Sequence, residues 1–234
     1  MTAHSSARGS IERRTGWCAL AMVAVIVINA AVSLALGAIP SSWTDDARVE
    51  VGEFLADPGN IDRSLAFFAF SNLIFVFGIG FFAGLRRLAD GFDDSGWTKG
   101  VVTLGAALFL AGGLVSETLH TGIAVALHLT PSYELDANAI LLLQSLWPTA
   151  LAQGQVGLGV VVVALSIGAW RAQGLPSWLV WLGTVAGVLA IMRPTVVSQV
   201  PLFIALFVPM FAWIVAIGVV LINRSSEERS GVVA

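Results

Sequence analysis

The chain has 234 residues, of which 57% are hydrophobic and 12% charged, against roughly 25% charged residues in ordinary soluble domains. A net charge of −3 and basic runs no longer than two residues exclude a nucleic-acid-binding surface. Cys18 is the single cysteine, which excludes an intrachain disulfide, a cysteine-based zinc site and an iron–sulfur cluster within one chain. The composition indicates an all-α integral membrane protein, and the length suits one bundle of about six spans.

The chain opens with a polar segment, residues 1–16, which we predict to be a disordered cytoplasmic tail. The first predicted span runs from Trp17 to Ile39 and ends at Pro40. This apolar run is longer than the core of a signal peptide, so we expect an uncleaved helix.

An acidic connection, residues 41–64, precedes the second span. Within this connection, apolar side chains recur at helical spacing and predict a short amphipathic helix on the outward-facing surface of the membrane. These side chains are Ala47, Val51, Phe54 and Leu55. The sequence Asp-Pro-Gly-Asn at residues 57–60 predicts the turn that ends this helix.

The second predicted span covers Leu65 to Leu85, where Gly80 and Gly84 offer a close-packing groove for another helix. A charged connection follows, with aspartates at positions 90, 93 and 94 that are typical of a solvated loop. The spacing of Asp90, Asp93 and Asp94 does not fit an EF-hand cation site. The third span, Val101 to His128, is the longest, and Pro131 ends it.

The second half of the chain adds three more spans. We predict that Asn138 to Trp147 forms an interfacial or re-entrant helix, which Pro148 separates from the fourth span; a continuous helix with a proline kink is the alternative. The fourth span covers Thr149 to Trp170, and the fifth runs from Pro176 to Arg193. The sixth, Val200 to Ile222, is expected to kink at Pro209, and a polar cytoplasmic tail covers residues 223–234. The spans make a single transmembrane domain over residues 17–222.

The distribution of positive charge predicts the orientation. With the N-terminus in the cytoplasm, nine of the twelve Lys and Arg residues lie inside: Arg8, Arg13, Arg14, Arg86, Arg87, Lys99, Arg171, Arg224 and Arg229. Arg48, Arg63 and Arg193 then lie outside. By the positive-inside rule we expect a multi-pass protein of the plasma (inner) membrane with both termini in the cytoplasm.

Two segments resemble a known family. They are GNIDRSLAFFAFSNLIF at residues 59–75 and VVVALSIGAWRAQGLPSWLVWLGTVAGVL at residues 161–189. Together they cover about a third of the chain and are similar to the DUF4386 family of small bacterial multi-pass membrane proteins. The resemblance implies a bundle of six or seven helices and no particular chemistry, and it assigns no role to Glu117 or His120.

Polar residues gather in the outer part of the predicted bundle. Glu117 and His120 lie one turn apart in the third span, where a carboxylate at membrane depth is costly and needs a partner. We predict a pocket around these two, with further lining residues from other helices: Asn72, Gln153, Gln155 and Arg193. The alternative is that these groups only satisfy one another between helices. Asn29 is the one strongly polar side chain expected near the midplane.

Several functions are compatible with such a pocket. A binding or sensory protein needs only the pocket and a lipid or small-molecule ligand, and we rank this function first. An enzyme acting on a lipid or small substrate in the outer leaflet ranks second, because no catalytic motif accompanies Glu117 and His120. A small transporter is disfavoured by the apolar inner halves of the spans. We expect no cofactor: a bis-histidine haem site needs histidines on facing helices, and His120 and His128 share one helix, about 12 Å apart along its axis. We expect no metal, because a site built from Glu117 and His120 needs further ligands that no other span clearly supplies.

Overall fold

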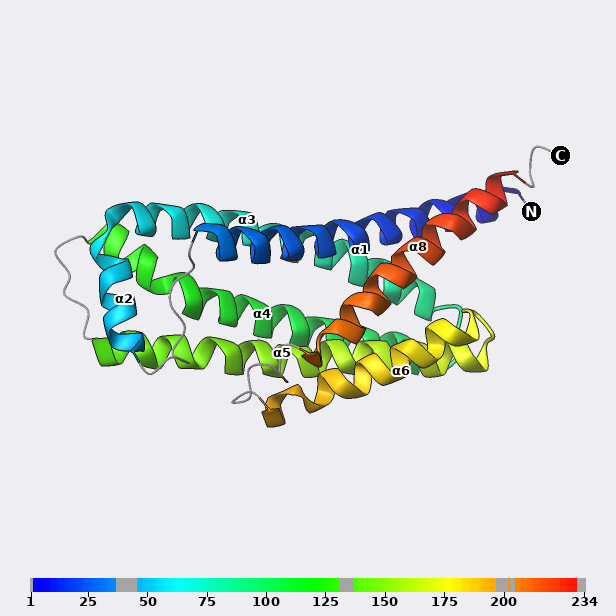
Figure 1. The fold of residues 1–234 in the computed structure, drawn as a ribbon. Helices are drawn as coiled ribbons and strands as arrows, with labels where there is room; N and C mark the ends of the chain where they lie inside the picture. The colour runs from blue at the N-terminus through cyan, green and yellow to red at the C-terminus, as the bar shows by residue number, and fades with distance from the viewer. Residues whose placement is uncertain (1, 37–45, 131–136, 197–201, 203–204, 231–234) are drawn as a thin grey trace.

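The computed structural model describes residues 2–36, 46–130, 137–196, 202 and 205–230 (Figure 1). Within these residues the chain is helical and contains no strand. The elements in order are α1 (Thr2–Leu36), α2 (Ala47–Ala56), α3 (Pro58–Ala89), α4 (Trp97–Leu129), α5 (Ala137–Arg171), α6 (Ser177–Met192), the 3-10 helix η1 (Arg193–Val196) and α8 (Val208–Ser230). The predicted ends at Pro40 and Pro131, and the predicted start at Val200, lie outside the described residues.

Six helices are long and apolar enough to cross a membrane, which confirms the prediction of an all-α, multi-pass membrane protein. They are α1, α3, α4, α5, α6 continued by η1, and α8. We call the end of the bundle where α1 starts and α8 finishes the inner end, and the end that carries α2 the outer end (Figure 1). At the outer end α3, α4 and α5 extend beyond α6 and α8 (Figure 1). With 32 to 35 residues, these three helices are about 50 Å long, against about 30 Å of hydrocarbon.

Exposed tryptophans mark one boundary of the hydrocarbon. Trp97 begins α4, Trp170 lies at the end of α5, and Trp178 and Trp181 lie in the first turns of α6. All four expose more than half of their surface, between 55% and 71%. Tryptophan concentrates where hydrocarbon meets head groups. The inner interface therefore lies at the connections α3–α4 and α5–α6.

The two polar ends are helical where the structure describes them. α1 begins at Thr2 and α8 continues to Ser230, so the prediction of a disordered tail at residues 1–16 was wrong for residues 2–16. These segments contain no proline and continue a nucleated helix, whose extension costs far less than starting a new one. Arg224 also ties α8 to the inner end, because its Nη1 donates to the Gly174 carbonyl at 2.6 Å.

Both interior prolines are accommodated within helices. α5 runs unbroken through Pro148, so residues 138–147 are not a separate interfacial helix and the alternative of one continuous helix is what the structure shows. A proline removes one backbone hydrogen bond, and the rest of α5 keeps its ladder. The kink expected at Pro209 is absent from the described helix α8, because Pro209 is its second residue, where the missing N–H has no helical partner to lose.

Close packing at small residues holds neighbouring helices together. A Cβ on Gly80 of α3 would lie 2.7 Å from the Cys18 sulfur of α1, so the predicted groove on α3 receives α1. A Cβ on Gly112 of α4 would lie 2.6 Å from the Gly154 Cα of α5. Contacts this short require glycine and bring the helix backbones together, as is common in membrane bundles.

The predicted amphipathic helix exists as α2, and it packs on protein. α2 lies across the outer ends of the long helices and contacts α5 and α3 (Figure 1). Val51 is 1% exposed and clusters with Ile123 of α4 and Ile140 of α5. The apolar face of α2 thus covers the outer ends of α4 and α5, in place of the membrane surface that the sequence predicted.

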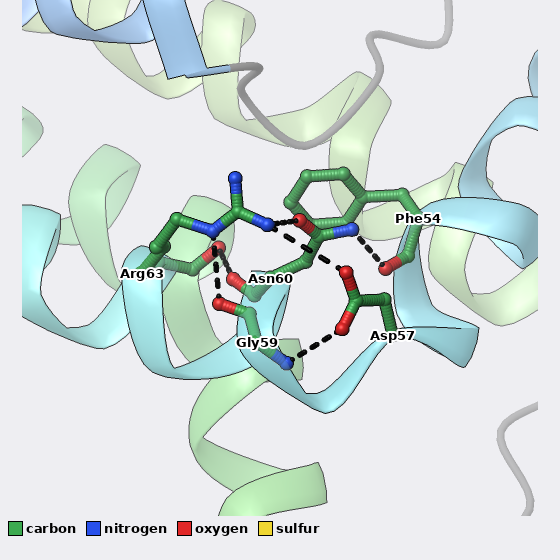
Figure 2. Close-up of polar contacts among 6 residues, drawn as sticks. Phe54, Asp57, Gly59, Asn60 and Arg63 are labelled. Carbon is green, nitrogen blue, oxygen red and sulfur yellow. Dashed lines mark hydrogen bonds and ion pairs between the residues drawn. The ribbon is translucent and has the colours of Figure 1, made fainter.

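A polar junction fixes the sharp turn between α2 and α3 (Figure 2). Asp57 caps α3 by accepting a hydrogen bond from the Gly59 amide at 2.8 Å. Asn60 donates to the Phe54 carbonyl at the end of α2 (2.9 Å), and Arg63 donates to the Asn60 side chain (2.5 Å) and pairs with Asp57 at 3.6 Å. The predicted turn at 57–60 is therefore the N-terminal cap of α3, and it sets the direction of α2.

Candidate functional site

Three of the spanning helices meet at one chain of polar side chains. Asn29 of α1 donates through Nδ2 to the Ser71 hydroxyl of α3 at 2.6 Å. Ser71 is 1% exposed, and its side chain hydrogen-bonds the carboxyl group of Glu117 on α4. Because the Ser71 oxygen accepts from Asn29, its own proton is available to donate to the carboxylate. The predicted residue Glu117 is thus connected to α1 through a hydroxyl on α3.

A second pair of contacts joins this position to α5. Ser116, next to Glu117, donates its hydroxyl to the Trp147 carbonyl at 2.9 Å. The rings of His120 and Trp147 lie 5.1 Å apart and are tilted by 56°, a common arrangement of neighbouring aromatic rings. Four helices therefore contribute to one site, which we call the Glu117 site: Asn29, Ser71, Ser116, Glu117, His120 and Trp147.

Two oxygens of the Glu117 site are buried without a hydrogen-bond donor among the residues that the structure describes. They are Oε1 of Glu117 and Oδ1 of Asn29. Both residues remain partly exposed, so the site is reachable although these atoms face inward. A buried polar group that lacks a partner costs about 1–3 kcal/mol. The site therefore has spare acceptor capacity and no donor in the described chain that satisfies it.

The Glu117 site lies near the outer boundary of the hydrocarbon. Twenty residues of α4 separate Trp97, at the inner interface, from Glu117, which corresponds to about 30 Å along the axis. The hydrocarbon core of a bilayer is also about 30 Å thick. Helix tilt shortens the projected depth, so Glu117 lies at or just inside this boundary.

Apolar side chains close the site on its inner side. Phe75 of α3 lies against Gly113 of α4, one turn below Glu117, where a Cβ would be 2.8 Å from the Phe75 ring. Further inward the rings of Phe82 and Phe109 meet edge to face at 5.5 Å. Met22 of α1 is 1% exposed in the same core. Between α1, α3 and α4, the Glu117 site consequently has no polar continuation toward the inner end among the described side chains.

Two of the predicted lining residues lie elsewhere. Asn72 follows Ser71 in α3, but its Nδ2 donates to the Phe68 carbonyl of the same helix at 2.9 Å. This bond satisfies the amide locally, as asparagine often does within helices. Gln153 is exposed on the surface of α5.

Gln155 and Arg193 belong to a separate level of the bundle. Gln155 lies eight residues beyond Trp147 on α5, about 12 Å further inward. Arg193 starts η1, which packs against α5, and its guanidinium carbon lies 4.6 Å from the centre of the Phe207 ring. Both side chains are buried, at 2% and 3% exposure. The predicted pocket therefore divides into the Glu117 site and a deeper level of the bundle, where Gln155 and Arg193 are buried.

The charged residues of the connections have structural roles. Asp93 accepts hydrogen bonds from the Thr98 and Trp97 amides and the Ser95 hydroxyl at the start of α4 (2.9, 3.1 and 2.8 Å). The bonds from Thr98 and then Ser95 hold the pKa of this exposed carboxyl far below its usual value. Asp90 pairs with Lys99 at 2.6 Å. In the described part of the chain, no three His, Cys, Asp or Glu side chains gather to hold a metal ion.

Comparison with known proteins found no matching family model, no matching curated protein and no matching solved structure. The resemblance to the DUF4386 family therefore stays a prediction, and the case for function rests on the geometry of the site.

Proposed function

We propose that this protein binds a small-molecule or lipid ligand at the Glu117 site, from the outer side of the membrane, and acts as a sensory or binding protein. The observation that carries this proposal is the pair of buried, donor-free oxygens on Glu117 and Asn29. Their desolvation is costly to the fold, and a ligand that donates hydrogen bonds or carries positive charge offsets that cost. The tilted rings of His120 and Trp147 add an apolar and aromatic wall.

Binding fits the surroundings of the site better than transport does. A transporter places its substrate near the middle of the bilayer and opens a path to each side. Here the polar chain sits near one boundary, and Phe75 packed on Gly113 blocks the way inward. The outer extension of α3, α4 and α5, with α2 packed across it, supplies the other wall of such a site.

The proposal includes an orientation. The inner end carries the exposed tryptophans and most of the basic residues, among them Arg86, Arg87 and Arg171. The positive-inside rule supports placing this end in the cytoplasm, so that both termini are cytoplasmic and α2 faces outward. We assign the protein to the plasma (inner) membrane on the same basis.

Native mass spectrometry of the full-length protein, purified in mild detergent, tests the proposed function. We expect a fraction of the wild type to carry an additional bound mass, and Glu117→Gln to lose it, because the substitution removes the charge and one acceptor. Glu53→Gln, which changes an exposed glutamate on α2, is the matched control and should retain the mass. A bound species that is equally abundant on wild type and Glu117→Gln would contradict a ligand site at Glu117.

A further inference from the structure

The hydrogen-bonding capacity of the Glu117 site indicates the chemistry of its ligand. The Asn29 amide group donates to Ser71, and the Ser71 hydroxyl donates to one oxygen of Glu117. The buried atoms of Asn29 and Glu117 that lack a partner are both acceptor oxygens. Ser71 Oγ also retains one lone pair. Three acceptor oxygens from three helices therefore surround this position, beside the second N–H of the Asn29 amide.

Geometry keeps these oxygens close together. Both the Asn29 amide and the Glu117 carboxyl bond to the same Ser71 oxygen, so their free oxygens lie within roughly 6 Å of it, given ordinary hydrogen-bond lengths and group sizes. Acceptor oxygens from α1, α3 and α4 therefore lie around one hydroxyl, and a ligand that coordinates all three would join the three helices.

Among the described residues of the same three helices, no lysine or arginine lies at the level of Glu117 to balance its charge. On α1 the nearest is Arg14, fifteen residues from Asn29, or about 22 Å along the axis. On α3 it is Arg63, about 12 Å outward from Ser71, where it is held in the α2–α3 junction. On α4 it is Lys99, about 27 Å inward and paired with Asp90.

The remaining neighbours bring limited positive charge. Between residues 137 and 170 α5 contains no Lys, Arg or His. His120, one turn outward from Glu117, packs at a tilt against Trp147, and Arg193 of η1 lies over the Phe207 ring at the deeper level. Glu117 therefore has one titratable neighbour at its own level, His120, and no lysine or arginine there among the described residues. A bound cation would offset the cost of a carboxylate near the hydrocarbon boundary.

We propose that the ligand of the Glu117 site is a small monovalent cation, coordinated by Glu117 Oε1, Asn29 Oδ1 and Ser71 Oγ. This inference rests on the proposed function and specifies its ligand class. Hard cations and ammonium groups both prefer carboxylate, carbonyl and hydroxyl oxygens, so an alkali metal ion and a primary ammonium group are the two sources of this chemistry. The cation neutralises Glu117 and cross-links α1, α3 and α4, and the protein is stabilised to the extent that the cation is bound.

Thermal unfolding of the full-length protein in detergent tests the inference, with tryptophan fluorescence as the signal. The pH and ionic strength are held constant while choline chloride is replaced by sodium, potassium or methylammonium chloride. Choline is too large to sit between three packed helices and serves as the baseline. We expect a saturable rise in Tm of roughly 3–6 °C with at least one small cation. A response to sodium or potassium alone identifies a metal ion, and a response to methylammonium alone identifies an amine head group.

The variants determine whether the effect arises at this site. Glu117→Gln should abolish the salt-specific rise, Ser71→Ala should shift its midpoint to higher salt, and Glu53→Gln should leave both unchanged. Ser71→Ala retains the charge of Glu117 and so provides a second reading if Glu117→Gln fails to fold. Superimposable unfolding curves of the wild type in all four salts, or a full rise in Glu117→Gln, would overturn the inference.

The two proposals fail in distinguishable ways. If the salts have no specific effect but a Glu117-dependent mass is present in native spectra, the ligand is not a small cation and the binding function stands. If neither is observed, both proposals are wrong, and the chain Asn29–Ser71–Glu117 serves only to join helices.

Discussion

Replacing Ser71 by alanine tests the polar chain in its structural role. The substitution removes the acceptor for Asn29 and the donor to Glu117 at once, since both bonds end on one hydroxyl with 1% exposure. Hydrogen bonds between helices in membranes average about 0.6 kcal/mol and reach about 1.7. Two such bonds amount to roughly 1–3 kcal/mol, which for a chain of this size lowers Tm by about 3–9 °C.

Ser64→Ala provides the control on the same helix. Its hydroxyl donates to the Asn60 carbonyl at 2.8 Å, within α3, and the backbone keeps its own bond when that donor is removed. We expect Ser64→Ala to change Tm by less than about 2 °C. The measurement is thermal unfolding of both variants in choline chloride, so that no small cation contributes. Equal Tm values for Ser71→Ala and Ser64→Ala would refute the conclusion that Ser71 connects α1 with α4.

Three further predictions follow from other parts of the structure. Gly112→Leu should destabilise the protein by more than about 3 kcal/mol, because a side chain there meets the α5 backbone. Gly100→Leu, whose Cβ has open space around it, should cost less than about 1.5 kcal/mol when the two variants are compared by chemical unfolding. Asp93→Ala should increase deuterium uptake at pH 7 in the first turn of α4, near Thr98. Because the folded pKa of Asp93 is depressed, deuterium uptake there in the wild type should increase only as pH falls below about 4. In a background without Cys18, Gly52→Cys should react with an impermeant thiol reagent from outside intact cells and Gly100→Cys only after lysis; the reverse pattern would invert the proposed orientation.

The number of spans and some of their limits were predictable because apolar length is a direct property of sequence. The third span was expected over Val101 to His128, and α4 covers Trp97–Leu129. The fifth was expected to start after Pro176 and close at Arg193, as α6 and η1 do. A membrane offers no water to unsatisfied backbone groups, so a long apolar run leaves the chain few alternatives to a helix.

The conformation and packing of the polar segments next to the spans were less predictable. Polarity at residues 2–16 indicates contact with water, but it does not distinguish a coil from a helix that extends beyond the membrane. The same limit applies to α2, whose apolar face was identified from spacing. The sequence could not show that Val51 would bury itself against Ile123 and Ile140, because that contact depends on how far α4 and α5 extend beyond the bilayer.

Glu117 and His120 stood out in the sequence because ionisable residues within spans are rare, but their partners did not. Asn72 is more polar than Ser71 and was one of the four expected lining residues, yet one residue along a helix turns the side chain by about 100°. Ser71 faces Asn29 and Glu117, while Asn72 bonds within its own helix. Choosing between adjacent residues requires the rotation of α3, which hydropathy does not provide.

That rotation is set by the small-residue groove on α3. Gly80 faces Cys18 of α1, and in an antiparallel pair a step outward on one helix matches a step outward on the other. Gly78 of the same helix faces Met22 of α1, where an added Cβ would lie 3.6 Å from the Met22 sulfur. Ser71 lies seven residues outward from Gly78 and Asn29 lies seven residues outward from Met22, which is about two turns on each helix. Once Gly78 is known to face Met22 of α1, the meeting of Asn29 with Ser71 follows from helix geometry. The polar chain that carries the proposed site is therefore positioned by glycine packing in the apolar half of the bundle, and substitutions in that groove should disturb the site from a distance.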